Sequence, residues 1–440
     1  MISKINKFIL LLLSVAGILS PGTVRSQPLS SDSLSLITII REVIQTHPMV
    51  KKATEELTTS DARIGFAQSA SLPTVDFASS YSRIGPISQI TLPDVGTFSL
   101  MPHDNYAASF NLNQTISDFG KTDKNVQLEK QGKELNITSV EQVKQKLSQV
   151  VTGNYYSLVY LQEAVKIKDE QLGLLNEHLR YIQKKLETGS ATQYEILTTQ
   201  VRISVIENQK TDIETALKLQ ICQLNTLLGK PVNTPHKVKN DLNREQQQPV
   251  CDSLIAVALT CRDEMKLARG KAKLAEIRLS LTNSQNNPVF NAFFSGGIKN
   301  GYIPYMYDPK ANYVAGVGIK VPVFDGKRNK YNLVLARSAM DINDHETEIT
   351  RRTIINEVVE SLSNLDASQK KIYQSELQLS QATQAYELAK VRFSSGVITN
   401  LELLEGSTAI SESRLMLLKA RIEYSVNIFK VKSAIGERLY

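Results

Sequence analysis

The chain repeats itself, and this internal duplication is the strongest constraint on its fold. Pro73 matches Pro288 at a spacing of 215 positions. Further along, the spacing is 207 positions for the matching pairs Tyr106 and Tyr313, Gly189 and Gly396, and Gly229 and Gly436. The difference predicts a longer loop between Ser82 and Asn105 in the first copy. Units of about 200 residues exceed the period of solenoid repeats, so the pattern indicates an ancient duplication of one domain.

The duplication also divides the chain into segments. We expect the first repeat over residues 27–229 and the second over residues 251–440. Between them, residues 230–250 are polar and contain three prolines and three consecutive glutamines, which is typical of a linker.

The first 26 residues are predicted to be a cleaved signal peptide. Lys4 and Lys7 precede an apolar run from Phe8 to Leu19, which is too short to cross ~30 Å of hydrocarbon. No cysteine lies beside this segment, so a lipid anchor is not expected. No later stretch is a continuous apolar run of the length that a membrane-spanning helix needs. We therefore expect an exported protein without membrane-spanning helices.

Each repeat is predicted to contain a helix, two strands and two further helices. The last two helices carry a seven-residue spacing on both sides of a glycine. In the first repeat the positions are Leu158, Val165, Leu172, Leu179 and Leu186, then Ile196, Ile203, Lys210, Leu217 and Leu224. In the second they are Leu365, Ile372, Leu379, Tyr386 and Phe393, then Leu403, Ile410, Leu417, Tyr424 and Val431. This spacing predicts antiparallel helix pairs, with Gly189 and Gly396 ending the first helix of each pair in a left-handed conformation.

The predicted helices are too long for a compact domain. A helix from about Lys121 to Glu187 would reach ~100 Å, and the returning helix from Ala191 to Leu228 would cover ~57 Å. The segment from Leu34 to Ser71 offers a similar length again. Two short helices placed end to end would therefore match one long helix.

The predicted strands alternate between apolar and polar residues. Tyr106, Ala108, Phe110, Leu112 and Ile116 share one face, as do Val75, Phe77 and Tyr81, and in the second repeat Tyr313, Ala315, Val317, Ile319, Val321 and Val323. The opposite face is polar, and we expect Asp76, Asn111, Asn113 and Thr115 on it to face a lumen. Alternating strands of about ten residues are typical of membrane barrels, although strands of a soluble sandwich also alternate.

Four strands per chain are too few to close a barrel. Strands within a membrane need a closed sheet without free edges, so several chains would have to share one barrel. Two chains would give a barrel filled by side chains, whereas three would give twelve strands and leave room for a lumen. The fold class is thus predicted to be mainly α-helical with a transmembrane β-barrel portion.

The sequence lacks the residue patterns that several classes of function require. The formal charge of +7 falls to +4 without Lys4, Lys7 and Arg25, and no run of Lys and Arg with interleaved aromatic residues suggests nucleic acid as a partner. The five histidines are scattered, and no nucleophile motif or nucleotide-binding glycine loop occurs. We expect no catalytic, cofactor or metal site. The three cysteines, Cys222, Cys251 and Cys261, are expected to be small buried packing residues.

The corners between strand and helix carry a recurring motif. Val321–Lys327 reads VPVFDGK, and Gln114–Lys121 is its counterpart in the first repeat. Such an aspartate can cap the following helix, and such a glycine permits the turn. The motif resembles the P-(L/V)-F-D-G-G corner of TolC-like outer-membrane efflux proteins, although Lys327 stands where a second glycine is common. The candidate corner residues are Asp118, Gly120, Pro322, Asp325 and Gly326.

The resemblance extends over the chain beyond residue 26. The turns after Gly189 and Gly396 resemble helix tips of the family, and His47-Pro48 resembles its entry segment; Arg262-Asp263-Glu264, the second entry, lacks the proline. The resemblance implies a homotrimer with a twelve-stranded barrel on a long periplasmic helical tunnel. It also implies a passive exit channel of a tripartite efflux pump in the outer membrane. Its partners would be outer-membrane lipid, a periplasmic adaptor that docks at Gly189 and Gly396, and an inner-membrane transporter that supplies the energy.

Acidic residues near the two tips are candidates for a periplasmic gate. They are Glu195, Glu402 and Glu405. The last two match acidic positions that ring the entrance in characterised members of the family. Three copies around an axis would favour cations. An ordinary solvated helix face is the alternative interpretation of these glutamates.

Two other functions remain open at this point. An exit channel of a type I protein-secretion system would have a similar sequence, and neighbouring genes would distinguish it. A periplasmic coiled-coil scaffold without a pore would have neither a membrane band on its strands nor a trimer. The identity of the substrate is not encoded in a recognisable motif.

Overall fold

The first long helix has the bounds predicted from the sequence, and the helix that returns from it begins at Gln193 and not at Ala191. The computed structural model describes residues 34–242 and 251–440, without the side chains of residues 251 and 252. The predicted signal peptide and the glutamines of the predicted linker lie outside the described residues. The helices are α2 (Leu36–Thr46), α3 (Pro48–Ser69), α4 (Lys121–Glu187), α5 (Gln193–Leu228), α6 (Cys251–Cys261), α7 (Asp263–Asn283), α8 (Arg328–Ser394) and α9 (Asn400–Ala434). The predicted helix over residues 121–187 is confirmed.

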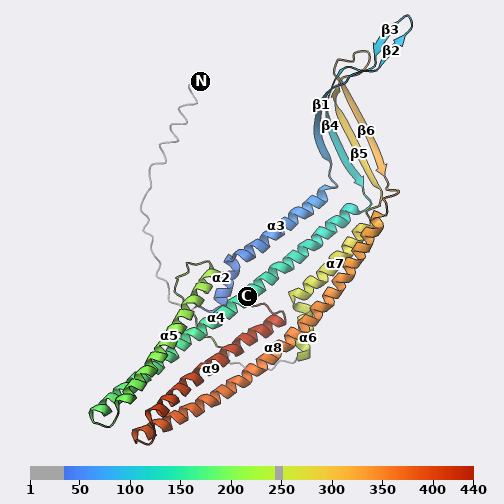
Figure 1. The fold of residues 1–440 in the computed structure, drawn as a ribbon. Coiled ribbons are helices and arrows are strands. Elements are labelled where there is room, and N and C mark those ends of the chain that lie inside the picture. Colours follow the sequence, from blue (N-terminus) through green and yellow to red (C-terminus); the bar gives the residue numbers. More distant parts are fainter. Residues whose placement is uncertain (1–33, 243–250) are drawn as a thin grey trace, which may run out of the picture. The chain divides into compact units, whose positions relative to one another are not determined.

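The two repeats give the same elements at the spacings seen in the sequence (Figure 1). α4 and α8 each have 67 residues and begin 207 positions apart. α2 and α6 begin 215 positions apart, as do α3 and α7. The division of the chain into two repeats and a linker stays a prediction, but part of the predicted linker is packed. Val238 is buried in the main core and pairs with Leu34, and Lys239 accepts a hydrogen bond from Tyr155.

Two short helices match one long helix, as predicted. α3 packs against the first part of α4, where Lys133 pairs with Asp61, and α5 packs against its last part, where Lys210 pairs with Asp169. α7 and α9 cover α8 in the same way.

The predicted heptad positions form much of the core. Those of α9, which are Leu403, Ile410, Leu417, Tyr424 and Val431, are all buried. In the first repeat Leu158 and Leu224 are fully buried in one cluster with Ile39 and Tyr155. Replacing one fully buried leucine by alanine costs ~2–5 kcal/mol, so the heptads supply a large part of the stability of the helix pairs.

The strands form one antiparallel sheet of four strands and a separate hairpin. The strands are β1 (Thr74–Arg83), β2 (Gln89–Leu92), β3 (Gly96–Ser99), β4 (Asp104–Ser117), β5 (Val289–Lys299) and β6 (Lys310–Lys320). The order in the large sheet is β1-β4-β5-β6. The hairpin β2–β3 occupies the longer loop predicted after Ser82, and its two strands were not expected from the sequence.

Two expectations about single residues are wrong. β6 ends at Lys320, so Val321 and Val323 do not continue its apolar face; Pro322 has no N–H to donate to a sheet, and the corner begins there. Cys261, the last residue of α6, is exposed instead of buried. Cys222 is half-buried.

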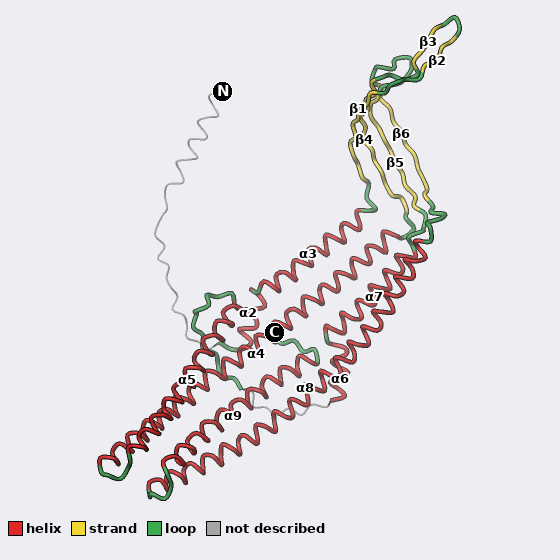
Figure 2. The backbone as a smooth tube through the Cα atoms, in the orientation of Figure 1, coloured by secondary structure: helices red, strands yellow, loops and turns green. Residues whose placement is uncertain are grey.

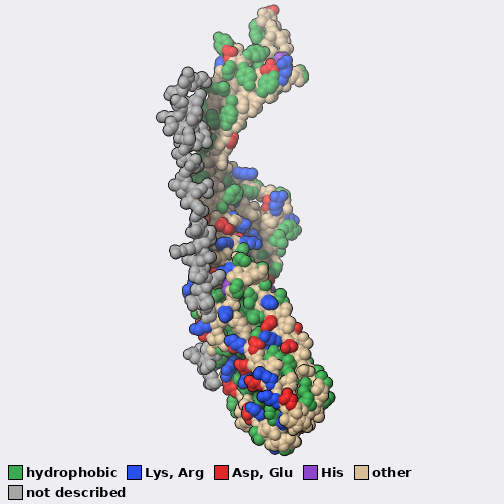
Figure 3. Space-filling view, turned by 90° about the vertical axis from the view of Figure 1, so that its left-hand side faces the viewer, with side chains coloured by type: hydrophobic (Ala, Val, Ile, Leu, Met, Phe, Trp, Pro, Cys, Tyr) green, Lys and Arg blue, Asp and Glu red, His purple; other side chains and the backbone are tan. Residues whose placement is uncertain are grey.

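The helices and the strands follow the same lateral order. α3 packs on α4, α4 on α7, and α7 on α8. In the chain these helices directly precede or follow β1, β4, β5 and β6, and the strands lie in that same order in the sheet. Figure 2 shows each strand next to its own helix. On the face seen in Figure 3, charged side chains are dense over the helices and sparser over the strands. Each repeat thus adds two strands and two helices to one continuous layer.

Candidate functional site

Polar side chains on one face of the sheet contact one another across three strands. Nδ2 of Asn111 on β4 donates a hydrogen bond of 3.0 Å to Oδ2 of Asp76 on β1. The Ser295 hydroxyl on β5 donates to Oδ1 of the same asparagine at 2.7 Å. Two further predicted residues, Asn113 and Thr115, line a groove on the sheet. We call this set, with Lys320, the polar strand face.

Phe293 also belongs to this face, although it is not among the residues predicted to lie there. It lines the same groove, and its ring lies over Gly316 on β6, where an added Cβ would come within 2.6 Å of the ring. A glycine in the middle of a strand often marks a place where another side chain approaches the backbone closely. Gly316 was therefore the signal in the sequence for a bulky neighbour such as Phe293.

The opposite face of the sheet is apolar and exposed. Phe77 on β1 and Phe110 on β4 pair with ring centroids 5.1 Å apart. On the edge strand β6, Tyr313, Val317 and Ile319 are between 64% and 78% exposed. Exposed apolar surface of this extent indicates contact with another protein or a membrane.

The corner aspartates hold the starts of the two long helices. Asp118 accepts hydrogen bonds from the backbone N–H of Gly120 at 3.1 Å and of Thr122 at 2.7 Å. Asp325 accepts one from the N–H of Asn329 at 2.9 Å, and this bond is the main cause that lowers the pKa of its carboxyl group. Both corners therefore satisfy N–H groups that a helix start leaves unpaired.

The corner backbones need left-handed residues. Gly120 has φ of 89° and Gly326 has φ of 67°. Lys327, the residue that departs from the family motif, also has a left-handed φ of 66°. Pro322 lies in the exposed segment just before this turn.

The tip glycines have the predicted conformation. Gly189 and Gly396 have φ of 75° and 72°, and each follows the end of a 67-residue helix. The chain then reverses into α5 and α9.

Two of the three candidate gate residues form capping boxes. Glu195 accepts hydrogen bonds from the backbone N–H and the hydroxyl of Thr192, and Glu402 does the same with Thr399. The backbone bond from Thr399 is the largest cause that lowers the pKa of Glu402. The Thr-x-x-Glu pattern that signals such a box was present in the sequence. Glu405 lies one turn further along α9, is exposed, and has no hydrogen bond or ion pair within the described part of the chain.

A cluster of four side chains joins the two helix pairs near the tips. His178 and Tyr181 on α4, Phe393 on α8 and Asn400 on α9 form this tip cluster. Nε2 of His178 lies 2.6 Å from Oδ1 of Asn400, and its ring meets that of Phe393 edge to face. Nδ2 of Asn400 bonds the carbonyl oxygen of Glu195 on α5. Burial lowers the pKa of His178, which opposes its protonation.

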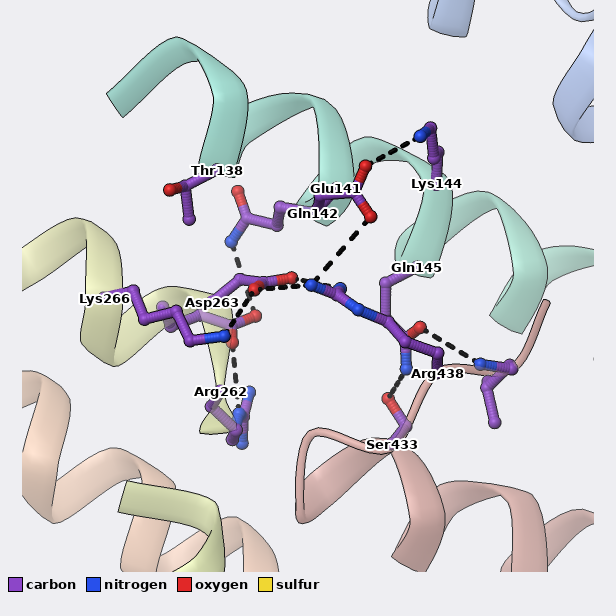
Figure 4. Close-up of polar contacts among 12 residues, drawn as sticks. Thr138, Glu141, Gln142, Lys144, Gln145, Arg262, Asp263, Lys266, Ser433 and Arg438 are labelled. Atoms are coloured by element: carbon purple, nitrogen blue, oxygen red, sulfur yellow. Dashed lines mark hydrogen bonds and ion pairs between the residues drawn. The ribbon is translucent and has the colours of Figure 1, made fainter. Parts of the chain in front are cut away.

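A network of ion pairs surrounds the start of α7 (Figure 4). Arg262 bonds the carboxylates of Glu264 and Glu357, and Arg438 bonds Asp263 through two nitrogens. Burial raises the pKa of Glu264, but the Arg262 guanidinium outweighs this effect and keeps the pKa below its usual value. Arg262 and Asp263, the centre of this network, stand where the first entry has His47 and Pro48.

Metal sites and membrane helices are not found in the described ranges. No group of three His, Cys, Asp or Glu side chains in residues 34–242 and 251–440 is arranged to hold a metal ion. Of the helices described, none combines the length and the apolar character needed to cross a bilayer.

Comparisons with known proteins identify similar chains. Residues 39–230 and 254–437 match the family model described as outer membrane efflux protein. The pyoverdine export outer membrane protein OpmQ of Pseudomonas aeruginosa is 22% identical over 287 residues, which are 64% of this chain and 60% of OpmQ. The cation efflux system protein CusC of Escherichia coli K12 is 23% identical over 298 residues, 65% of this chain and 63% of CusC. The match thus spans less than two thirds of the length of these relatives.

The fold resembles that of a solved structure over nearly all of the chain. A crystal structure of CusC superposes with a TM-score of 0.78 at 17% identity, and the match covers 92% of each chain. At this identity the likeness concerns the fold.

Proposed function

The chain belongs to the outer membrane efflux protein family, and we propose that it is the passive outer-membrane exit channel of a tripartite pump that exports small molecules. The observation that carries the proposal is the shared lateral order of strands and helices, β1-β4-β5-β6 above α3-α4-α7-α8. This layer has open edges on both sides, and further copies of the chain would close it.

The strand directions permit this closure. All neighbours in the sheet are antiparallel, so β1 and β6 run in opposite directions and β6 can pair with β1 of a second copy. Three copies give twelve strands, enough for a barrel with an open lumen. Closure removes the free edges that a membrane sheet cannot have.

The edge helices carry apolar residues that suit the same contact. Leu335, Ile342 and Ile349 on α8 are spaced by seven, and each is more than half exposed. On α3, Phe66 is 82% exposed. A homotrimer would bury both sets, with α8 of one copy against α3 of the next.

The two faces of the sheet then have separate roles. The polar strand face, with Asp76, Asn111, Asn113 and Thr115, lines the lumen, and the apolar face contacts outer-membrane lipid. The lumen would then offer polar groups along its length, which suits a passive duct.

The tips are the proposed meeting point with the pump. The helix pairs end at Gly189 and Gly396, one helix length away from the strands, so a periplasmic adaptor would dock there. An inner-membrane transporter supplies the energy, and the N-terminal segment directs export of the chain. Three copies of Glu405, with Glu402, would surround the periplasmic entrance.

Cross-linking tests the assembly. In a background with Cys222, Cys251 and Cys261 replaced by serine, Phe66→Cys and Tyr331→Cys together should give disulfide-linked trimers, because these residues lie on the facing edge helices. Each single substitution is the matched control and should give no disulfide-linked trimer. A protein that stays monomeric and soluble without detergent would refute the proposal.

Transport assays test the substrate class. Deletion of the gene should raise the sensitivity of cells to small toxic compounds, and the intact gene should restore resistance. If deletion instead abolishes secretion of a protein and leaves drug sensitivity unchanged, the channel serves protein secretion. If purified trimers give no current in a planar bilayer, a scaffold without a pore is the better interpretation.

A further inference from the structure

A buried polar layer lies beside the tip cluster, between the two helix pairs. Its members are Lys168 and Gln171 on α4 and Ser407 and Ser411 on α9. Each is at most 7% exposed. Buried polar groups normally have hydrogen-bond partners, so a buried polar atom without one in this layer calls for a ligand or a water molecule.

Neighbouring contacts place the four residues at one level. α4 approaches its tip and α9 leaves its own, so the two helices are antiparallel. On the tip side, His178 meets Asn400, and Leu175 shares an apolar cluster with Leu404. At the level of the layer itself, Arg414 on α9 bonds Glu170, which lies between Lys168 and Gln171 on α4, at 2.5 Å. Gln171 and Lys168 precede Leu175 by one and two turns, and the two serines follow Leu404 by one and two turns.

Three polar atoms in this layer have no partner in the described chain. They are Nε2 of Gln171, Oγ of Ser407 and Oγ of Ser411. The amide nitrogen can only donate, and each hydroxyl can donate. The layer therefore presents three hydrogen-bond donors without an acceptor.

The layer also contains a positive charge without a carboxylate bonded to it. Lys168 donates to Oε1 of Gln171 at 3.3 Å and to Oε1 of Gln209 on α5 at 2.9 Å, and both acceptors are neutral amides. Its third N–H remains available. Burial lowers the pKa of Lys168; exposed Glu412 on α9 opposes this effect and Arg202 on α5 adds to it.

We propose that one halide ion, chloride in the cell, is bound in this layer by Lys168, Gln171, Ser407 and Ser411. A halide accepts several hydrogen bonds at once and supplies the negative charge that the layer lacks. A water molecule would satisfy some donors but leave the lysine without a bonded anion, and a metal cation would be repelled by it. Because the donors come from α4 and α9, the bound ion ties the two helix pairs together. The inference concerns the interior of one chain and does not depend on the proposed function.

Anomalous diffraction tests the position of the ion. Crystals of the protein grown or soaked in bromide should show an anomalous peak within about 3.5 Å of Nζ of Lys168. Density of a water molecule without an anomalous signal would overturn the proposal.

Thermal unfolding in solution tests the same site. At about 0.15 M salt, Tm should be ~2 °C higher in chloride or bromide than in gluconate. Ser411→Ala and Lys168→Met should abolish this difference. Ser368→Ala is the matched control, because Ser368 is equally buried but its hydroxyl already bonds the Leu365 carbonyl oxygen, and it should keep the difference.

Lys168→Met and Ser411→Ala test the halide site independently of each other. If Lys168→Met does not fold, Ser411→Ala alone answers the question, since it removes one small donor. An equal halide response in wild type, Ser411→Ala and Ser368→Ala would refute the site.

Discussion

Nε2 of His178 lies 2.6 Å from Oδ1 of Asn400, although the two residues are 222 positions apart. Asn400 also bonds the carbonyl oxygen of Glu195 and the hydroxyl of Thr199. One asparagine at the start of α9 thus connects the second repeat to both long helices of the first. The contact holds the two helix pairs together near their tips.

Replacing Asn400 by alanine should loosen this contact. The change leaves Nε2 of His178 without its partner, which costs ~1–3 kcal/mol for a buried group, whereas the Thr199 hydroxyl stays bonded to the Glu195 carbonyl oxygen. We expect a lower Tm and more frequent large-conductance openings in a planar bilayer. Asn427→Ala is the control, because Asn427 is half-buried and its side chain bonds the Asn364 carbonyl oxygen within the α8–α9 pair. Equal conductance in both variants would show that the tip cluster does not restrain the entrance.

Stability should fall in mild acid because of His178. Burial holds its folded pKa below the usual ~6.5, so the unfolded chain takes up a proton before the folded chain does. The stability present above pH ~6.5 is therefore lost as the pH falls towards the folded pKa. Tm measured from pH 7.5 to 5 should show this decrease, and His178→Gln should reduce it. A part should remain, because burial also lowers the pKa of His236. An unchanged pH profile in His178→Gln would contradict the prediction.

Gly189→Val and Gly396→Val should weaken coupling to an adaptor. Both glycines have φ above 70°, a conformation that a β-branched residue adopts only with strain. We expect cells with both substitutions to become drug-sensitive while trimers still reach the outer membrane. Gly173→Ala, within α4 and with open space around its Cα, is the control and should leave resistance intact. Unchanged resistance in the double valine variant would count against docking at the tips.

Charge at Glu402 and Glu405 should control block by multivalent cations. Glutamine at 402 keeps the hydrogen bonds of the capping box while it removes the charge. The double variant Glu402→Gln and Glu405→Gln should therefore keep its Tm and lose the block of current by a trivalent cation added on the periplasmic side. Glu207→Gln, an exposed change on α5, is the control for lost charge. If wild type and the double variant are blocked alike, these glutamates are ordinary solvated residues.

Lys327→Gly should stabilise the protein. Lys327 has a left-handed φ of 66°, and glycine adopts this conformation without steric cost. We expect an increase of about 1 kcal/mol in the free energy of unfolding, reduced by the greater entropy of glycine in the unfolded chain. Gly326→Ala at the neighbouring left-handed position should have the opposite sign. A lower Tm for Lys327→Gly would show that its side chain contributes more than its backbone strain costs.

The helices were predictable from the sequence because their signals are local. A seven-residue period, a glycine after Glu187 and an aspartate before Lys121 lie within the helix or beside its ends, so the bounds of α4 follow directly. The faces of β1 and β4 were equally accessible, since alternation is a property of neighbouring residues.

The functional assignments were harder because they depend on contacts between distant segments. The threonines three positions before Glu195 and Glu402 indicate capping boxes, and a gate role for these glutamates stays a prediction. The contact of His178 with Asn400 depends on how two helix pairs meet, and no pattern around His178 encodes it. The hairpin β2–β3 was missed because its two strands are only four residues each and lie in a loop without a counterpart in the second repeat.

The duplication has a consequence for symmetry. β4 pairs with β5 at the boundary between the repeats, with Asn111 opposite Ser295. Shifted by the two spacings of 207 and 215, that pair becomes Gly318 on β6 and Ser80 on β1, the two free edges. A trimer that reuses the internal pairing would place Gly318 opposite Ser80 of the next copy, and six nearly equivalent units would surround one axis. The boundary inside a single chain would then resemble the boundary between chains. The residues at both boundaries have to fit nearly the same contact, so the trimer would have pseudo-sixfold symmetry in addition to its threefold symmetry.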